Sequence, residues 1–132
     1  MLDVRRGTAT REAFNYANDL LDLKRYGEAK SFLRKDIPVA QRVLGKIHDI
    51  TLSMRSIYAR VLFTDPGSTL DDLRETVATL EEVEQTARRV FGNTHPLTTE
   101  IERNLRIARA ALQILREIAL RRRAPPPEST MR

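Results

Sequence analysis

Two histidines are the side chains of this sequence best suited to acid–base or metal chemistry, and there is no cysteine among its 132 residues. His48 and His95 each lie three residues after a glycine that ends an apolar helical pattern. This position indicates a turn or N-cap role. A metal site would need carboxylates converging on an imidazole, and no pattern suggests that. We therefore expect no bound metal and no cofactor.

A run of acidic residues offers a second route to chemistry. Glu81, Glu82 and Glu84 could imitate the paired carboxylates of general acid–base catalysis. On an amphipathic helix the same run is typical of a solvated face. The sequence contains no nucleophile motif, phosphate-binding loop or His-x-x-x-His element. We therefore expect a protein that is not an enzyme and has no catalytic residue.

The elements that must position these side chains are predicted to be helices. Apolar residues recur three and four positions apart along almost the whole chain, and no stretch alternates with a period of two. The pattern predicts helices over about 9–23, 26–44, 49–63, 69–91 and 97–122. Gly45 and Gly92 follow helix ends, where a left-handed residue is favoured. Pro38 is expected to kink or split the second helix near Asp36. The predicted fold is all-α with about five helices.

The composition narrows the class of protein. Hydrophobic residues make up 41% and charged residues 31%, as in an ordered chain. No apolar run reaches the roughly 18 residues of a membrane span, and the start lacks a secretory signal, so we expect a cytoplasmic protein with no membrane partner. Residues 1–8 are predicted to be an N-terminal extension, 9–122 a helical repeat domain and 123–132 a basic, proline-rich tail.

The basic residues at the end of the last helix have three interpretations. Arg121, Arg122 and Arg123 follow one another immediately before a run of prolines, and the chain carries a net charge of +5. Cations are favoured at a helix C-terminus by the helix dipole. The alternatives are a nuclear-localisation or nucleic-acid contact and a proline-rich docking tail.

Internal repetition is the strongest signal in the sequence. Residues 39–48 and 86–95 match in step, 47 positions apart. The identical pairs are Ala40 and Ala87, Arg42 and Arg89, Val43 and Val90, Gly45 and Gly92, and His48 and His95. The preceding helices also match. Asn15-Tyr16-Ala17 lies 42 residues before Ile57-Tyr58-Ala59, and Asn104-Leu105-Arg106 lies 47 residues after it.

The repeated unit resembles the tetratricopeptide repeat (TPR) of the kinesin-light-chain type over about residues 9–112. The family's Asn-Leu-Ala triplet is echoed at Asn15 and Asn104, its Gly-x-Tyr-x-x-Ala turn at 24–29, and its Leu-Gly-x-x-His-Pro ending at 44–48 and 91–96. The second copy departs from the family, with Asp65-Pro66-Gly67 in its turn. The resemblance implies an α-solenoid of antiparallel hairpins at about 9–44 and 49–91, followed by a long fifth helix.

The same resemblance implies a groove lined by the first, third and fifth helices. The candidate groove residues are Asn15, Asn18, Asp19, Arg55, Arg60, Arg103 and Asn104. Asparagine can clamp a peptide backbone and arginine can fork onto carboxylates, although each of these residues could instead be an ordinary solvated side chain. The leading prediction is a scaffold that binds a protein or peptide, free-standing or within a larger assembly. The alternative is a basic helical-repeat protein that contacts RNA or DNA.

The fifth predicted helix carries a second apolar row. Ile107, Ala111, Ile114 and Ile118 lie beside the row that should face its neighbours. One interpretation is a long capping helix folded over the end of the array. The other is an interface with a second copy or a partner, because large exposed apolar patches usually mark interfaces.

Overall fold

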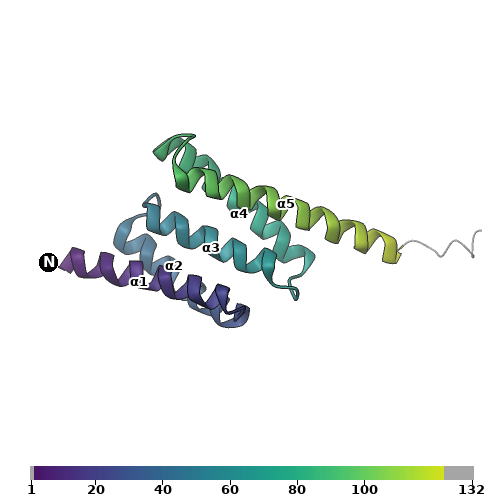
Figure 1. Cartoon of the computed structure of the whole chain (residues 1–132), viewed down its shortest axis with the longest axis horizontal. Coiled ribbons are helices and arrows are strands. Elements are labelled where there is room, and N and C mark those ends of the chain that lie inside the picture. The colour runs from purple at the N-terminus through teal and green to yellow at the C-terminus, as the bar shows by residue number, and fades with distance from the viewer. Residues whose placement is uncertain (1, 124–132) are drawn as a thin grey trace, which may run out of the picture.

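Five helices account for the part of the chain that the structure describes, residues 2–123 (Figure 1). In this computed structural model they are α1 (Leu2–Asp22), α2 (Tyr26–Leu44), α3 (Asp49–Thr64), α4 (Leu70–Phe91) and α5 (Pro96–Arg123). No strand occurs between residues 2 and 123. The prediction of an all-α fold with about five helices is confirmed. None of these helices combines the length and apolar character needed to cross a membrane.

The first helix begins earlier than the sequence pattern predicted. α1 begins at Leu2, seven residues before the predicted start at residue 9. Its early sequence has no proline, and a single helical glycine such as Gly7 costs only about 1 kcal/mol relative to alanine. Nothing local therefore stops the helix. At the other end, α5 includes Arg123, and the predicted tail from residue 124 onward lies outside the described residues.

The second helix corrects the interpretation of Pro38. α2 is a single helix from Tyr26 to Leu44, with Pro38 inside it, so the helix is not split. Proline removes one backbone hydrogen bond, but its fixed φ is compatible with a helix. Leu33 and Ala40 are fully buried on either side of it. Tertiary packing of this apolar face holds the helix together where the local signal favoured a break.

The helices form two layers. α1, α3 and α5 lie side by side, with α3 packed against both of the others (Figure 1). α2 packs against α1 and α3, and α4 packs against α3 and α5. Within residues 2–123, α1 does not contact α4 or α5, and α2 does not contact α4. Each helix therefore packs only on its near neighbours in the chain, and the described helices do not close into a bundle.

The central helix α3 is shared between two hydrophobic cores. Met54 and Ile57 join a core with α1 and α2, whereas Leu52 and Ala59 join a core with α4 and α5. Nine of the 16 residues of α3 are buried. A helix that is apolar on two sides must be covered on both. α3 therefore couples the two ends of the molecule.

Two glycines end α2 and α4 in the same conformation. Gly45 has φ 96° and ψ 160°, and Gly92 has φ 94° and ψ 167°. Each N–H donates to a carbonyl four residues earlier, Gly45 to Gln41 at 3.1 Å and Gly92 to Arg88 at 3.0 Å. A left-handed residue was expected here, and φ is indeed positive. The extended ψ, however, places both residues in a region that is essentially restricted to glycine.

A part-buried ion pair ties α2 to the turn after α3. The Asp65 carboxylate accepts hydrogen bonds from Lys30 Nζ and from the backbone N–H of Gly67, both at 2.8 Å. These contacts hold the pKa of Asp65 below its usual value, with Lys30 the largest cause. The interaction fixes the one turn in which the two repeats differ in length.

The lowered pKa of Asp65 predicts a pH-dependent contribution to stability. A lowered folded-state pKa gives stability that is fully present above the unfolded value of about 3.9 and is lost as pH falls through the folded value. We expect Asp65→Asn to cost about 1 kcal/mol near neutral pH, with a smaller difference from the unmodified protein in acid. Urea unfolding of both proteins between neutral pH and about pH 3 would measure this. If the difference in unfolding free energy between the two proteins does not change with pH, the lowered pKa of Asp65 is contradicted.

Candidate interaction surfaces

The two histidines cap helices rather than converge with other reactive groups. His48 Nδ1 accepts the backbone N–H of Ile50 at 3.1 Å, and His95 Nδ1 accepts that of Leu97, also at 3.1 Å. His48 and His95 thus begin α3 and α5 in the same way, and the predicted N-cap role is confirmed. Across the described residues, no three histidine or acidic side chains gather as a metal-binding group would.

The acidic run on α4 makes ion pairs with three different arginines. Glu81 pairs with Arg109 of α5 at 3.0 Å, and Glu82 pairs with Arg55 of α3 at 3.3 Å. The third acid, Glu84, pairs with an arginine of its own helix. These carboxylates therefore point to separate partners and not to one another. Glu82 is 69% exposed, so its pair contributes little stability, and this arrangement suits a solvated face that links helices.

Two of the predicted groove residues contact side chains of neighbouring helices. Asn104 is buried, and its Nδ2 donates to Ser56 Oγ at 2.9 Å between α5 and α3. The Arg55 side chain is only 19% exposed and is directed to Glu82 of α4. The prediction that Asn104 faces a groove is therefore wrong. The burial of Asn104 could not be predicted from its residue type, because a buried asparagine and a solvated one differ only in what surrounds them.

The buried pair predicts an asymmetric response to mutation. Asn104→Ala leaves the Ser56 hydroxyl buried without its partner, which should cost about 1–3 kcal/mol. Replacing both residues, as Asn104→Leu with Ser56→Ala, should cost less than Asn104→Ala alone because no polar group is stranded. Urea unfolding measures each cost. Asn18→Ala is the control at a half-buried asparagine, and equal costs for Asn18→Ala and Asn104→Ala would contradict the buried bond.

Three equivalent positions share one face of the layer formed by α1, α3 and α5. The repeat offsets of 42 and 47 residues align Asn18 with Arg60 and Arg60 with Ile107. Asn18 and Arg60 are half-buried, and Ile107 is 45% exposed. The register therefore places an amide, a cation and an apolar side chain at equivalent positions of three neighbouring helices.

The other groove candidates lie at the two ends of this layer. Asn15 and Asp19 are exposed, and their counterparts Ile57 and Val61 in α3 are buried against α1 and α2. The two α1 residues therefore occupy the outer end face of α1. Arg103 is also exposed, whereas its counterpart Ser56 is buried against α5. The repeat register thus separates Asn15 and Asp19 from the face that contains Asn18 and Arg60.

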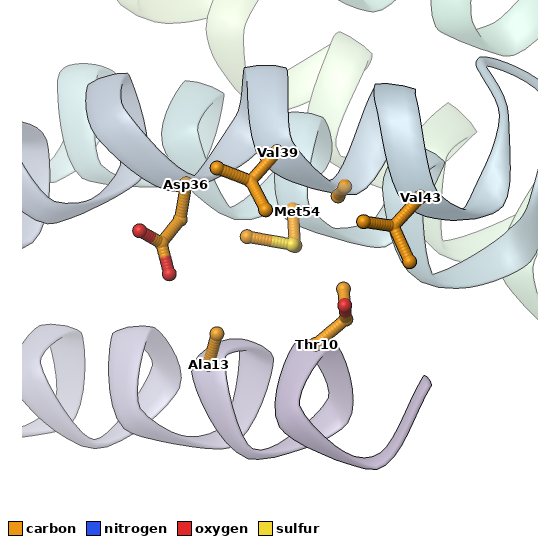
Figure 2. A pocket seen from close by; sticks show the side chains of 7 residues that line it. Thr10, Ala13, Asp36, Val39, Val43 and Met54 are labelled. Atoms are coloured by element: carbon orange, nitrogen blue, oxygen red, sulfur yellow. The ribbon is translucent and has the colours of Figure 1, made fainter. Parts of the chain in front are cut away.

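A small cavity lies between α1 and α2, and no sequence pattern predicted it. It is lined by Thr10, Ala13, Asp36, Val39, Ala40, Val43 and Met54 (Figure 2). Its volume is about 150 Å³, below the roughly 300 Å³ of ordinary small-molecule sites. Burial raises the pKa of Asp36. The cavity suits a few water molecules better than an organic ligand.

A larger hollow of about 330 Å³ lies between α2 and α4, with α3 as its floor. Its walls include Ile37, Pro38 and Glu75, and its floor includes Tyr58. Arg34 Nε donates to Tyr58 Oη at 3.0 Å, and this hydrogen bond is the main cause of a raised Arg34 pKa. The hollow is open and mixes apolar walls with charges of both signs.

The second apolar row of α5 is left open. Ile107, Ile114 and Ile118 are 45%, 58% and 40% exposed, and Ala111 between them is half-buried. The opposite face of α5 covers α3 and α4 through Ile101, Leu105, Ala108 and Leu112. With 28 residues against the 22 of α4, α5 also projects beyond the other helices (Figure 1). α5 therefore covers two neighbours, α3 and α4, and still presents an uncovered apolar face.

These features define an all-helical protein over residues 2–123. Comparisons of the chain with protein-family profiles, with curated proteins and with solved structures found no match. A functional assignment therefore depends on the geometry of the chain itself.

Proposed function

We propose that this chain is a TPR-like helical repeat, a short α-solenoid of antiparallel hairpins, that acts as a non-catalytic scaffold for protein interactions. The observation that carries the proposal is the recurrence of one turn. Gly45 and Gly92 share their backbone torsions, and His48 and His95 share their caps, 47 residues apart. A unit repeated with this fidelity, each copy packing on the next, is the structural principle of solenoid proteins.

The proposed binding face is the layer of α1, α3 and α5 around Asn18, Arg60 and Ile107. Adjacent packed helices lie about 8–10 Å apart, so the face is about 16–20 Å wide. An extended chain of roughly five or six residues would cross it. The Asn18 amide can donate to and accept from a peptide backbone, and Arg60 can pair with a carboxylate. The face therefore suits a short segment of another protein.

Affinity purification with mass spectrometry tests the proposal. The full chain, an Asn18→Ala/Arg60→Ala variant and an Arg89→Ala variant would each be used as bait. Arg89 is exposed on α4, in the other layer, and has no ionic partner among residues 2–123. We expect proteins that are retained by the unmodified chain and by Arg89→Ala but lost by the double variant. Identical sets for all three baits would refute this face as the binding surface.

Nucleic-acid binding is the second candidate, and the arginines of α5 favour it. Six of them have no ionic partner in the described part of the chain: Arg103, Arg106, Arg116, Arg121, Arg122 and Arg123. Binding through phosphate contacts weakens steeply as salt rises. Fluorescence anisotropy with RNA and DNA oligonucleotides over a salt series would decide. Strong, salt-sensitive binding supports this candidate, and protein capture that survives moderate salt supports the scaffold.

A further inference from the structure

The exposed row on α5 forms a continuous stripe. Ile107, Ala111, Ile114 and Ile118, which we call the α5 stripe, follow one another at intervals of four, three and four residues. This spacing places them on one side of a helix. Its three isoleucines are among the large apolar side chains that the described fold leaves exposed. The stripe has the spacing of a seam that packs against another helix.

Arginines stand at both ends of the stripe. Arg103 lies one turn before Ile107, and Arg121 lies three residues after Ile118. Neither has an ionic partner between residues 2 and 123, whereas Arg109, nearer to α4, pairs with Glu81. At 1.5 Å per residue the two arginines are about 27 Å apart along the helix. The apolar stripe is therefore bracketed by two available cations.

The charge of α5 disfavours a second copy as the occupant. The helix contains seven arginines and three glutamates, a net charge of +4, and Glu102 is already paired with Arg88. Two such helices packed on their stripes would oppose like charges, which is unfavourable for association. A helix that carries carboxylates would instead complement the bracketing arginines. Charge complementarity thus selects a partner that is acidic and amphipathic.

We propose that the α5 stripe binds an amphipathic helix of another protein, about 18 residues long. Its apolar side chains cover the three isoleucines, and carboxylates near its two ends pair with Arg103 and Arg121. Docking of an amphipathic helix through apolar anchors spaced by three and four residues is an established recognition mode. This inference rests on the proposed scaffold function and specifies the chemistry of a partner for α5.

The probe is a synthetic 18-residue helical peptide with leucines at the stripe spacing and glutamates near both ends. A matched peptide has lysines in place of the glutamates. Each would be titrated into the isotopically labelled full chain and followed by NMR chemical shifts. We expect the glutamate peptide to shift resonances of the α5 stripe and to bind at least about tenfold more tightly than the lysine peptide, which corresponds to 1.4 kcal/mol.

Two variants sharpen the test. Ile114→Asp should abolish binding, and Arg103→Glu with Arg121→Glu should reverse the preference towards the lysine peptide. All three positions are exposed, so the fold should be retained, and circular dichroism checks this. Equal affinity for the two peptides would overturn the inference, as would the absence of shifts along α5.

Two further outcomes separate this inference from the proposed scaffold function. Shifts confined to α1 and α3 around Asn18 and Arg60, with none at Ala111, Ile114 or Ile118, would refute the α5 inference but support the scaffold. Light scattering of the free chain tests whether a second copy of the chain occupies the stripe. A dimer that Ile114→Asp dissociates would mean that a second copy covers the stripe, which also overturns the inference.

Discussion

Replacing Leu52 with alanine is expected to lower the free energy of unfolding by about 2–5 kcal/mol. The Leu52 side chain is fully buried, in the core that α3 forms with α4 and α5. Truncation removes apolar contacts and leaves a cavity that packed helices fill only in part. Because domains of this size are stable by only about 5–15 kcal/mol, the loss is a large fraction of the total. Urea unfolding of the full chain, followed by far-UV circular dichroism, would measure it.

The control for this prediction makes the same chemical change at an exposed leucine. Leu23 lies in the turn between α1 and α2 and is 64% exposed. Leu23→Ala should change stability by no more than about 0.5 kcal/mol. Similar costs for the two substitutions would show that Leu52 is not packed between α3 and its neighbours, and the shared-core arrangement would have to be abandoned.

Gly45→Ala and Gly92→Ala are each expected to cost about 1–3 kcal/mol, because an alanine must adopt a backbone conformation that only glycine enters readily. A Cβ at either position would meet no atom within 4 Å. The expected loss therefore comes from the backbone and not from a clash. Since the two turns share their torsions, the two costs should agree within a few tenths of a kcal/mol. The melting temperature of each variant should fall by several degrees.

A third glycine provides the matched control. Gly27 lies in the first turn of α2, and a Cβ there also meets nothing within 4 Å. Gly27→Ala should be neutral or stabilise the protein by up to about 1 kcal/mol, because alanine is the better helix former. Gly92→Ala and Gly27→Ala should thus shift stability in opposite directions. A shift of the same sign and size would contradict the turn conformation at Gly92.

Several features of the fold follow from neighbouring residues in the chain. The helical spacing of apolar residues predicted five helices, and the glycines at 45 and 92 marked two of their ends correctly. His48 and His95 were predicted as caps from their distance to those glycines, and their hydrogen bonds confirm it. Such signals are reliable because backbone torsions and caps depend on residues within one or two turns.

Where the prediction failed, distant residues were responsible. Pro38 was expected to kink or split α2, but α2 is not split, and the burial of Leu33 and Ala40 holds the helix together on both sides of Pro38. Asn104 was expected in a groove, but α3 places Ser56 against it. In both cases packing against another helix decided the outcome.

The candidate surfaces also depend partly on neighbouring residues in the chain and partly on packing between helices. The apolar row of α5 could be recognised in the sequence, because its residues recur at helical intervals on one helix. Its exposure could not, since that depends on where α3 and α4 end relative to α5. Likewise the arginines could be counted, but which of them find a carboxylate was decided by the packing of α4 between α3 and α5. Helices and turns form from interactions along the chain, whereas burial and charge pairing arise only when helices meet.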